Sequence, residues 1–144
     1  MPTASYVKVT SANEDLVESI NAGTDQWAIA LTNTVPGSKT FTSGTTDLAT
    51  SGGYTAGGNN VTTTSSGMNG SDFVLVLADP AIWTGSGGGF TFRYALLVNK
   101  TVLQGANGTV VAYWDYGSSQ AVAAGETVTV DLDQTATVGT FKIT

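Results

Sequence analysis

Few residues in this chain have types and spacing that could support chemistry. Asp131 and Asp133 are separated by one residue, and paired carboxylates can bind calcium or hydrolyse a glycosidic bond. In a strand this spacing puts both acids on one face, and it puts Val128, Val130 and Leu132 on the other. We therefore interpret the acids as the solvated face of a strand whose opposite face enters the core.

The stretch TSGGYTAGG, residues 50–58, surrounds Tyr54 with four glycines and could cradle a phosphate. Gly53 and Gly57 are spaced as in some phosphate-binding loops, but no Lys-Ser or Lys-Thr follows and no helical pattern comes after. We interpret the stretch as a compact turn, in which glycines adopt positive φ and Tyr54 folds onto apolar neighbours.

The run Tyr113-Trp114-Asp115-Tyr116 is the third candidate. Strand alternation places Trp114 and Tyr116 on the side of Val110, with Tyr113 and Asp115 opposite. Such a group could be a platform for sugars, with Asp115 accepting hydrogen bonds from hydroxyls. Aromatic residues at strand spacing more often anchor a core or an interface, so we name these four residues as a candidate interface or aromatic patch.

The composition excludes most catalytic mechanisms. The 144 residues include no Cys and no His, which removes thiolate catalysis, Ser-His-Asp hydrolysis and nearly all zinc hydrolysis. We expect no enzymatic activity, no cofactor and no metal. The net charge of −6 and the scattering of five Lys and Arg residues oppose binding to nucleic acid or an anionic membrane.

The surface composition points to assembly. Charged residues make up only 11% of the chain, against about 25% in an ordinary soluble domain. A surface of low charge favours association with neighbours. The sequence has neither a signal-peptide pattern at its start nor an apolar run near the length of about 18 residues that spans a membrane, so we expect a soluble protein.

The hydrophobic pattern predicts one helix and seven or eight strands. The helix covers residues 11–20, with Ser11 or Asn13 as its cap and Leu16, Val17 and Ile20 on one face. The strands are expected at residues 5–10, 27–31, 60–64, 72–77, 89–98, 108–115, 126–132 and 139–143, separated by turns rich in Gly, Asn and Ser.

These elements predict a single all-β domain over residues 1–144. We expect an antiparallel β-sandwich or jelly-roll-like barrel with one short N-terminal helix. Residues 32–64 are the least decided segment, and we expect either an extended arm or a long loop there. Within it, residues 32–50 are our first candidate for a docking element, because a polar strand-prone arm can add to a neighbour's sheet edge.

Several short motifs follow one another in a fixed order. They are Gly53-Tyr-Thr-Ala-Gly-Gly58, Ile82-Trp83, Arg93-Tyr94-Ala95, Tyr113-Trp-Asp-Tyr-Gly117 and a short terminal strand. In this order, over about residues 15–144, the chain resembles a family of small tailed-bacteriophage virion proteins. The resemblance implies a structural protein of the phage particle, without catalytic positions.

The resemblance also implies which matched residues keep the fold. These are Gly53, Tyr54, Trp83, Arg93 and Tyr94, together with Asp115 of the aromatic run. Because Arg93 lies within an apolar strand, we expect it to pair with a carboxylate such as Asp115 or Asp79.

Our leading hypothesis is a capsid decoration, or cement, protein. It would bind the outer face of the icosahedral shell in the virion, after assembly in the bacterial cytoplasm, and stabilise the shell across subunit boundaries. Its partners would be the major capsid protein and neighbouring copies of itself, as a homodimer or homotrimer. The alternatives are a tail, tail-fibre or baseplate component, and a glycan-binding module that uses Tyr113, Trp114 and Asp115.

Overall fold

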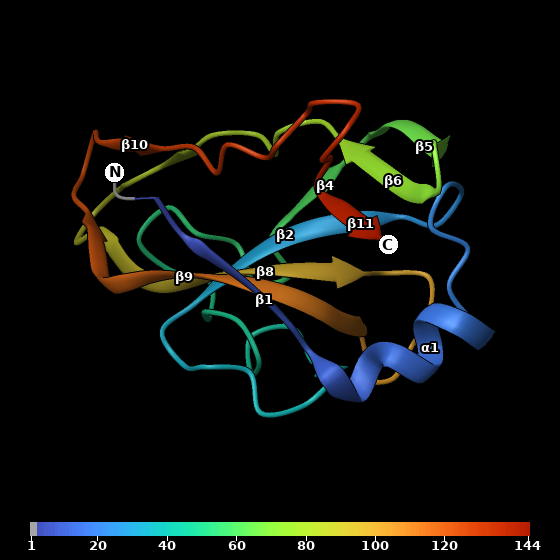
Figure 1. The fold of residues 1–144 in the computed structure, drawn as a ribbon. Helices are drawn as coiled ribbons and strands as arrows, with labels where there is room; N and C mark the ends of the chain where they lie inside the picture. Colours follow the sequence, from blue (N-terminus) through green and yellow to red (C-terminus); the bar gives the residue numbers. More distant parts are fainter. Residues whose placement is uncertain (1–2) are drawn as a thin grey trace.

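Antiparallel pairing joins the strands of residues 3–144, the part of the chain that the computed structural model describes (Figure 1). The larger sheet has the order β1-β9-β8-β2-β4, with β3 also paired to β9. A second sheet has the order β11-β6-β5, and β10 forms a short ladder with β7. The bounds are β1 Ser5–Lys8, η1 Thr10–Ala12, α1 Asn13–Glu18, β2 Trp27–Thr32, β3 Thr40–Phe41, β4 Asn59–Val61, β5 Thr63–Asn69, β6 Asp72–Leu77, β7 Trp83–Thr84, β8 Phe90–Asn99, β9 Gly108–Val122, β10 Thr127–Val128 and β11 Phe141–Ile143.

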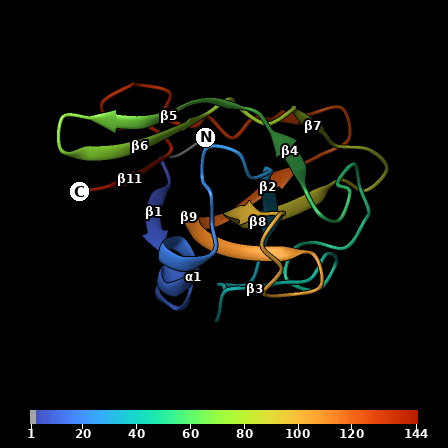
Figure 2. The same cartoon turned by 90° about the vertical axis from the view of Figure 1, so that its right-hand side faces the viewer.

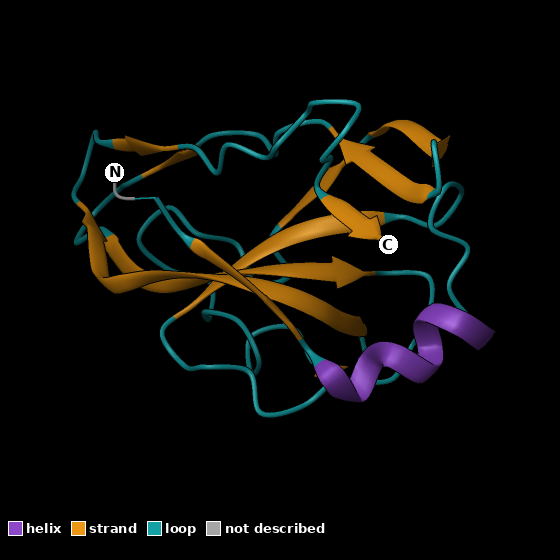
Figure 3. Cartoon of the chain, viewed as in Figure 1, coloured by secondary structure: helices purple, strands orange, loops and turns teal. Residues whose placement is uncertain are grey.

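The central strands of the larger sheet are buried on both faces. One face packs against the second sheet, where Ile29 and Leu97 meet Leu75 in the main core. The other face packs in a smaller core, where Phe41 covers Leu96. All six residues of β2 are buried, which explains why its sequence is an almost unbroken apolar run. The prediction of an all-β, sandwich-like domain with a short helix near the N-terminus is confirmed (Figure 3).

The helix lies where it was predicted, but it is shorter. A 3-10 turn leads into α1, and no side-chain cap is formed, so the prediction of Ser11 or Asn13 as a cap is wrong. Leu16 packs against the main core as expected, whereas Val17 is exposed, contrary to the prediction. The inward position is taken instead by Asp15, which lies one turn after the buried Ala12.

Within residues 32–64, the segment 33–58 between β2 and β4 forms a long loop that contains the short β3 and is fastened to the domain. Phe41 is fully buried, and β3 pairs with the start of β9. Directly before β3, the Nζ of Lys39 lies 2.8 Å from a carboxylate oxygen of the buried Asp15. This is an ion pair by distance, although the geometry does not make a hydrogen bond. Of the two alternatives for this segment, the structure therefore has the long loop and not a free arm.

Three predicted strands differ most from their bounds, and the short β3 and β7 were not predicted. β9 runs on to Val122 instead of ending at residue 115. The strand predicted at 126–132 is paired only over β10. Beyond β10, Val130 and Leu132 are buried and Asp131 is exposed, as the alternation predicted. The strand predicted at 60–64 is split between β4 and β5, and the length of β5 was missed.

The two edges of the sandwich are built differently. At one edge a single residue, Thr62, separates β4 in the larger sheet from β5 in the second sheet, so the chain itself closes this side. At the opposite edge β1 and β11 end their sheets and are not paired to each other. We call this side, defined by β1 and β11, the open edge. Figure 2 shows the second sheet over one side of the larger one, with β11 nearest to β1 and α1.

Candidate functional site

The aromatic run of β9 is divided between two sides of the larger sheet. Trp114 and Tyr116 pack with the main core, and Tyr116 meets Phe92 edge to face at 5.4 Å between ring centroids. Tyr113 lies on the other side and meets Tyr94 edge to face at 5.8 Å. The alternation predicted for these residues is therefore correct.

The predicted position of Val110 on the side of Trp114 is wrong. The ladder between β8 and β9 shifts register here, with Leu97 opposite Ala112 but Val98 opposite Val110. An extra residue in one strand reverses which face the preceding side chains take. Val110 consequently packs in the smaller core, while Ala112 packs in the main one.

Asp115 forms a salt bridge with Arg93. The guanidinium donates two hydrogen bonds to the carboxylate, at 2.8 Å from Nε and 3.1 Å from the terminal nitrogen, and the backbone N–H of Gly117 donates a third at 2.8 Å. The hydrogen bonds from Arg93 hold the pKa of Asp115 below its usual range. Of the two partners predicted for Arg93, Asp115 is confirmed, whereas Asp79 accepts from the N–H of Leu132.

Tyr113, Trp114 and Asp115 therefore do not share one surface. Asp115 is engaged with Arg93, and Tyr113 and Trp114 belong to different cores. A sugar-binding site at Trp114 would therefore need polar side chains other than Asp115, which the sequence suggested for this role. Tyr113, Asp115 and Tyr116 contact side chains of β8, whereas Trp114 contacts Tyr6 of β1.

Tyr54 is buried at the centre of its glycine-rich turn, as predicted. Its ring stacks on Trp83, with 6.3 Å between centroids and 25° between planes. Its hydroxyl donates to Asp47 at 2.5 Å and accepts from the N–H of Leu31 at 3.1 Å. Burial, and then the hydrogen bond to Asp47, raise the pKa of Tyr54 far above its ordinary value.

Asp47 was missed by sequence reasoning. It is buried and accepts hydrogen bonds from the N–H groups of Gly44 and Gly57, both at 2.6 Å, as well as from Tyr54. These bonds fasten residues 44–57 into one unit. No sequence pattern marked this aspartate, because its three donors are brought to it only by the fold of the loop.

Gly53 has a steric reason to be glycine. Its φ is +101°, and a Cβ added there would lie 2.0 Å from the carbonyl oxygen of Thr84. A non-glycine residue would be strained by its backbone and would clash with the strand that carries Trp83. Together with the burial of Tyr54, this confirms that TSGGYTAGG is a turn that the fold needs.

A groove runs along the open edge. Its walls come from Trp114, from Tyr6 on β1, whose ring meets the indole edge to face at 5.6 Å, and from residues 129–142. Two adjoining hollows of about 340 and 550 Å³ share Trp114 and Asp133. We call this feature the edge groove. Its lining residues are Thr3, Ala4, Tyr6, Trp114, Tyr116, Thr129, Val130, Asp131, Asp133, Val138, Gly139, Thr140, Phe141 and Lys142.

The edge groove carries two exposed carboxylates. Asp133 accepts from the N–H and the hydroxyl of Thr135, at 2.9 and 2.7 Å, and these bonds lower the pKa of Asp133. Asp131 lies close enough to Tyr116 that its charge adds to the effect of burial in raising the pKa of that phenol. Among residues 3–144, neither acid has a cationic partner. The groove therefore has aromatic side chains and two exposed acids, and the cation that also lines it, Lys142, is paired with Asp72.

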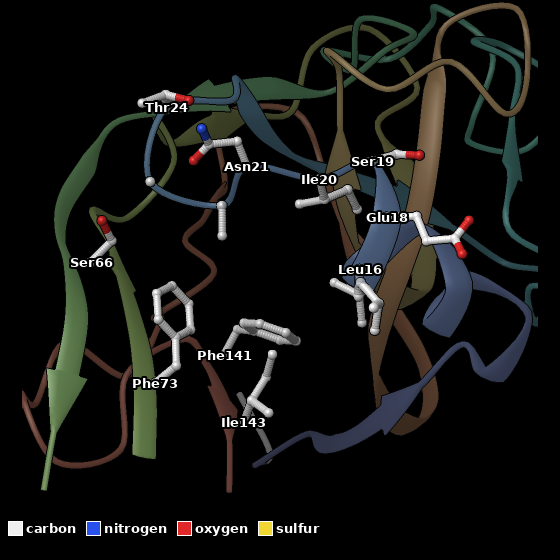
Figure 4. Close-up of a pocket in the computed structure, with 13 residues that line it drawn as sticks. Leu16, Glu18, Ser19, Ile20, Asn21, Thr24, Ser66, Phe73, Phe141 and Ile143 are labelled. Carbon is white, nitrogen blue, oxygen red and sulfur yellow. The ribbon is translucent and has the colours of Figure 1, made fainter. Parts of the chain in front are cut away.

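A separate hollow of about 660 Å³ lies where α1 faces the second sheet (Figure 4). Leu16 and Ile20 approach it from the helix side, and Phe73, Phe141 and Ile143 approach from the sheet. Phe141 lines both this hollow and the edge groove, so the two are neighbours along the open edge. No sequence signal pointed to this hollow, because its walls are far apart in the chain.

Comparisons with protein-family models, with curated proteins and with solved structures found no match. Among residues 3–144, no group of three or more Asp or Glu side chains is placed to hold a metal ion. In the same range, no helix has the length and the apolar character needed to cross a membrane.

Proposed function

We propose that this chain is a structural protein of a tailed-bacteriophage virion, and that it decorates the outer face of the capsid. The observation that carries the proposal is that the ordered motifs behind the family resemblance contact one another. Tyr54 stacks on Trp83, and Arg93 forms a bidentate pair with Asp115. Motif residues that are distant in sequence thus contact one another in the fold. Such contacts are expected if the motifs together support one fold.

The third pair joins the same two strands. Tyr94 and Tyr113 meet edge to face on the side of the larger sheet opposite the main core. The ladder is interrupted nearby, with Phe92 opposite Gln120 and Tyr94 opposite Asp115. The aromatic contact and the Arg93 pair add side-chain contacts between β8 and β9 beside this interruption, while the ladder continues on both sides of it.

The surface properties support a decorating role. A net charge of −6 suits an outer face, away from packaged DNA, and a charged fraction of 11% suits extensive contact with neighbours. The partners would be the major capsid protein and further copies of this chain. Many modest contacts acting together would stabilise the shell, so that the loss of any single one is tolerated.

The number of copies in the particle tests this proposal. In purified virions of the phage that encodes the chain, quantitative peptide mass spectrometry should find hundreds of copies, and a particle reconstruction should place them on the outer shell. A dozen or fewer copies would indicate the tail, tail fibre or baseplate instead. Absence from the particle would overturn the virion proposal as a whole.

A further inference from the structure

β1 presents unpaired backbone groups on the open edge. It is the terminal strand of the larger sheet and pairs only with β9. The N–H of Val9 donates to the carbonyl of Val111 at 2.9 Å, which fixes the alternation along the strand. By that alternation Val7 also points its backbone groups toward β9, and Tyr6 and Lys8 point theirs away from it. Free edge groups of this kind are satisfied in full only by another strand.

The side chains of β1 are exposed and mostly uncharged. Tyr6 is 41% exposed and Val7 37% exposed, both high for large apolar side chains in a strand. Lys8 is also exposed, and no ion pair within residues 3–144 includes it. Tyr6 and Lys8 lie on the face of the edge groove, since Tyr6 lines it and residues two apart share a face.

The cation of β1 and the acids of the edge groove complement each other. Lys8 has no acid partner, and Asp131 and Asp133 have no cation partner, in the part of the chain that is described. Asp133 lines a hollow together with Tyr6, and Asp131 lines the adjoining hollow. Lys8 follows Tyr6 by two residues, so it lies on the same face of β1. A strand that added to β1 with a lysine opposite Tyr6 would place that lysine next to Asp133.

We propose that the added strand is β1 of a second copy of this chain, paired antiparallel across a twofold axis at Val7. In this register Tyr6 of each copy faces Lys8 of the other and exchanges two backbone hydrogen bonds with it. Val7 packs on Val7 of the other copy, and each Lys8 reaches the edge groove of its neighbour. The contact is self-complementary, as a twofold interface requires.

The other free edges fit this role less well. In β11 the cation Lys142 is already paired with Asp72 at 3.3 Å. In β5 the exposed residues are Thr, Ser, Gly, Met and Asn, without a charge to match a neighbour. A shift that placed Lys8 opposite Lys8 would be opposed by like-charge repulsion. The second copy at β1 is thus the occupant that satisfies the backbone, the apolar side chains and the charges together.

Sedimentation velocity provides the first test. Because the interface is small, we expect a monomer–dimer equilibrium within about 1 to about 300 µM chain. Lys8→Glu should weaken the dimer by about tenfold, because it places an acid in the partner's negative groove. Asp133→Lys should weaken it likewise, and the double variant should recover most of the affinity. Glu18→Lys, which makes the same change of charge as Asp133→Lys but at an exposed helix position, should leave the equilibrium near that of the wild type.

Disulfide trapping gives a test that does not depend on charge. The chain has no cysteine, so a single introduced thiol can form only an intermolecular disulfide. In the proposed register the two Val7 Cα atoms lie about 4.5 Å apart, within the range of a disulfide. Val7→Cys should therefore give a covalent dimer on mild oxidation. Ser5→Cys, on the same strand and face, should not, because the two positions would be about 13 Å apart.

A monomer throughout the concentration range, equal crosslinking of the two cysteine variants, or no recovery in the double variant would each overturn the inference. Circular dichroism and thermal unfolding of each variant show whether it is folded. The inference does not rest on the proposed function. A monomeric protein could still decorate a capsid, and the copy number in the virion decides that question separately.

Discussion

A tyrosine, a tryptophan and an aspartate meet in two regions of this molecule, with opposite results. In the first region Tyr54 stacks on Trp83, and its hydroxyl donates to Asp47. All three side chains are buried, and the carboxylate accepts from three donors. In this region the polar groups of the tyrosine and the aspartate form their hydrogen bonds with other groups of the same chain.

In the second region Tyr6 meets Trp114 edge to face, and Asp133 lies in the same hollow. Here the tyrosine is exposed, and within residues 3–144 the carboxylate accepts hydrogen bonds from Thr135 alone, two residues along the chain. The same residue types therefore build a core in one place and an available surface in the other. The residue types are the same in both regions, so they do not explain why one group is buried and the other exposed. The difference depends on whether other segments of the chain cover the side chains.

The largest contrast is expected for the two tryptophans. Trp83→Ala should lower the free energy of unfolding by about 4 kcal/mol, because it empties a buried site beside Tyr54. Trp114→Ala should cost about 1 to 2 kcal/mol, since Trp114 is only partly buried. Urea denaturation measures both values. Trp83→Phe should cost less than Trp83→Ala, since the indole N–H has no partner among the described residues. Equal losses for the two alanine variants would remove the distinction between the regions.

The two aspartates should differ next. Asp47→Ala leaves the Tyr54 hydroxyl and two backbone N–H groups without an acceptor, and should cost about 3 kcal/mol. Asp133→Ala removes only exposed bonds to Thr135, and should leave the midpoint of urea denaturation almost unchanged. Asp47→Asn keeps part of the acceptor capacity and should fall between Asp47→Ala and the wild type. A stable Asp47→Ala protein would show that water replaces the carboxylate.

The hydroxyls of the two tyrosines provide a finer test. Tyr54→Phe should cost about 1 to 2 kcal/mol, because the N–H of Leu31 and one bond of Asp47 lose their partner. Tyr6→Phe should change the free energy of unfolding by less than about 0.5 kcal/mol, as an exposed substitution. Thermal unfolding at neutral pH measures this pair. A larger loss for Tyr6→Phe would mean that the open edge is covered in solution, as the proposed dimer predicts at high concentration.

The smallest effect is expected in alkali. Burial raises the pKa of Tyr54, and the partial burial of the Tyr6 ring against Trp114 raises the pKa of Tyr6 to about 12. A raised folded-state pKa means that the folded protein holds the proton more tightly, so stability is complete below the unfolded value of about 10 and falls as pH rises above it. Tyr54→Phe should lose stability less steeply above pH 10 than the wild type. Ultraviolet absorbance of tyrosinate during titration measures ionisation, and early ionisation of Tyr54 without unfolding would contradict its burial.

Patterns within short stretches of the sequence were predicted well. The alternation around Asp131 correctly placed Val130 and Leu132 inside, and the glycines correctly marked the turn around Tyr54. Both follow from the local geometry of a strand and from the φ freedom of glycine, which need no knowledge of the rest of the chain. The expectation that a cation in an apolar strand pairs with a carboxylate likewise named Asp115 as one of two candidate partners for Arg93, and this pair is formed.

Features that depend on distant segments were missed or misplaced. The register shift near Val110 reversed a face that strict alternation had assigned, because a bulge is set by how two strands pack and not by either strand alone. Asp47 gained its role only when residues 44–57 folded around it. The edge groove is formed by strands and loops separated by more than a hundred residues.

By itself the sequence determined the β-class, the turns and the polarity of strand faces where no bulge intervenes, since these arise from residue period, glycine conformation and charge. Only the tertiary structure decided which aromatic residues are core and which are surface, and which strand edges remain free. The reason is that burial and edge pairing are relations between segments. Tyr54 is covered because a loop returns over it, and Tyr6 is exposed because no strand of the described chain lies beyond β1.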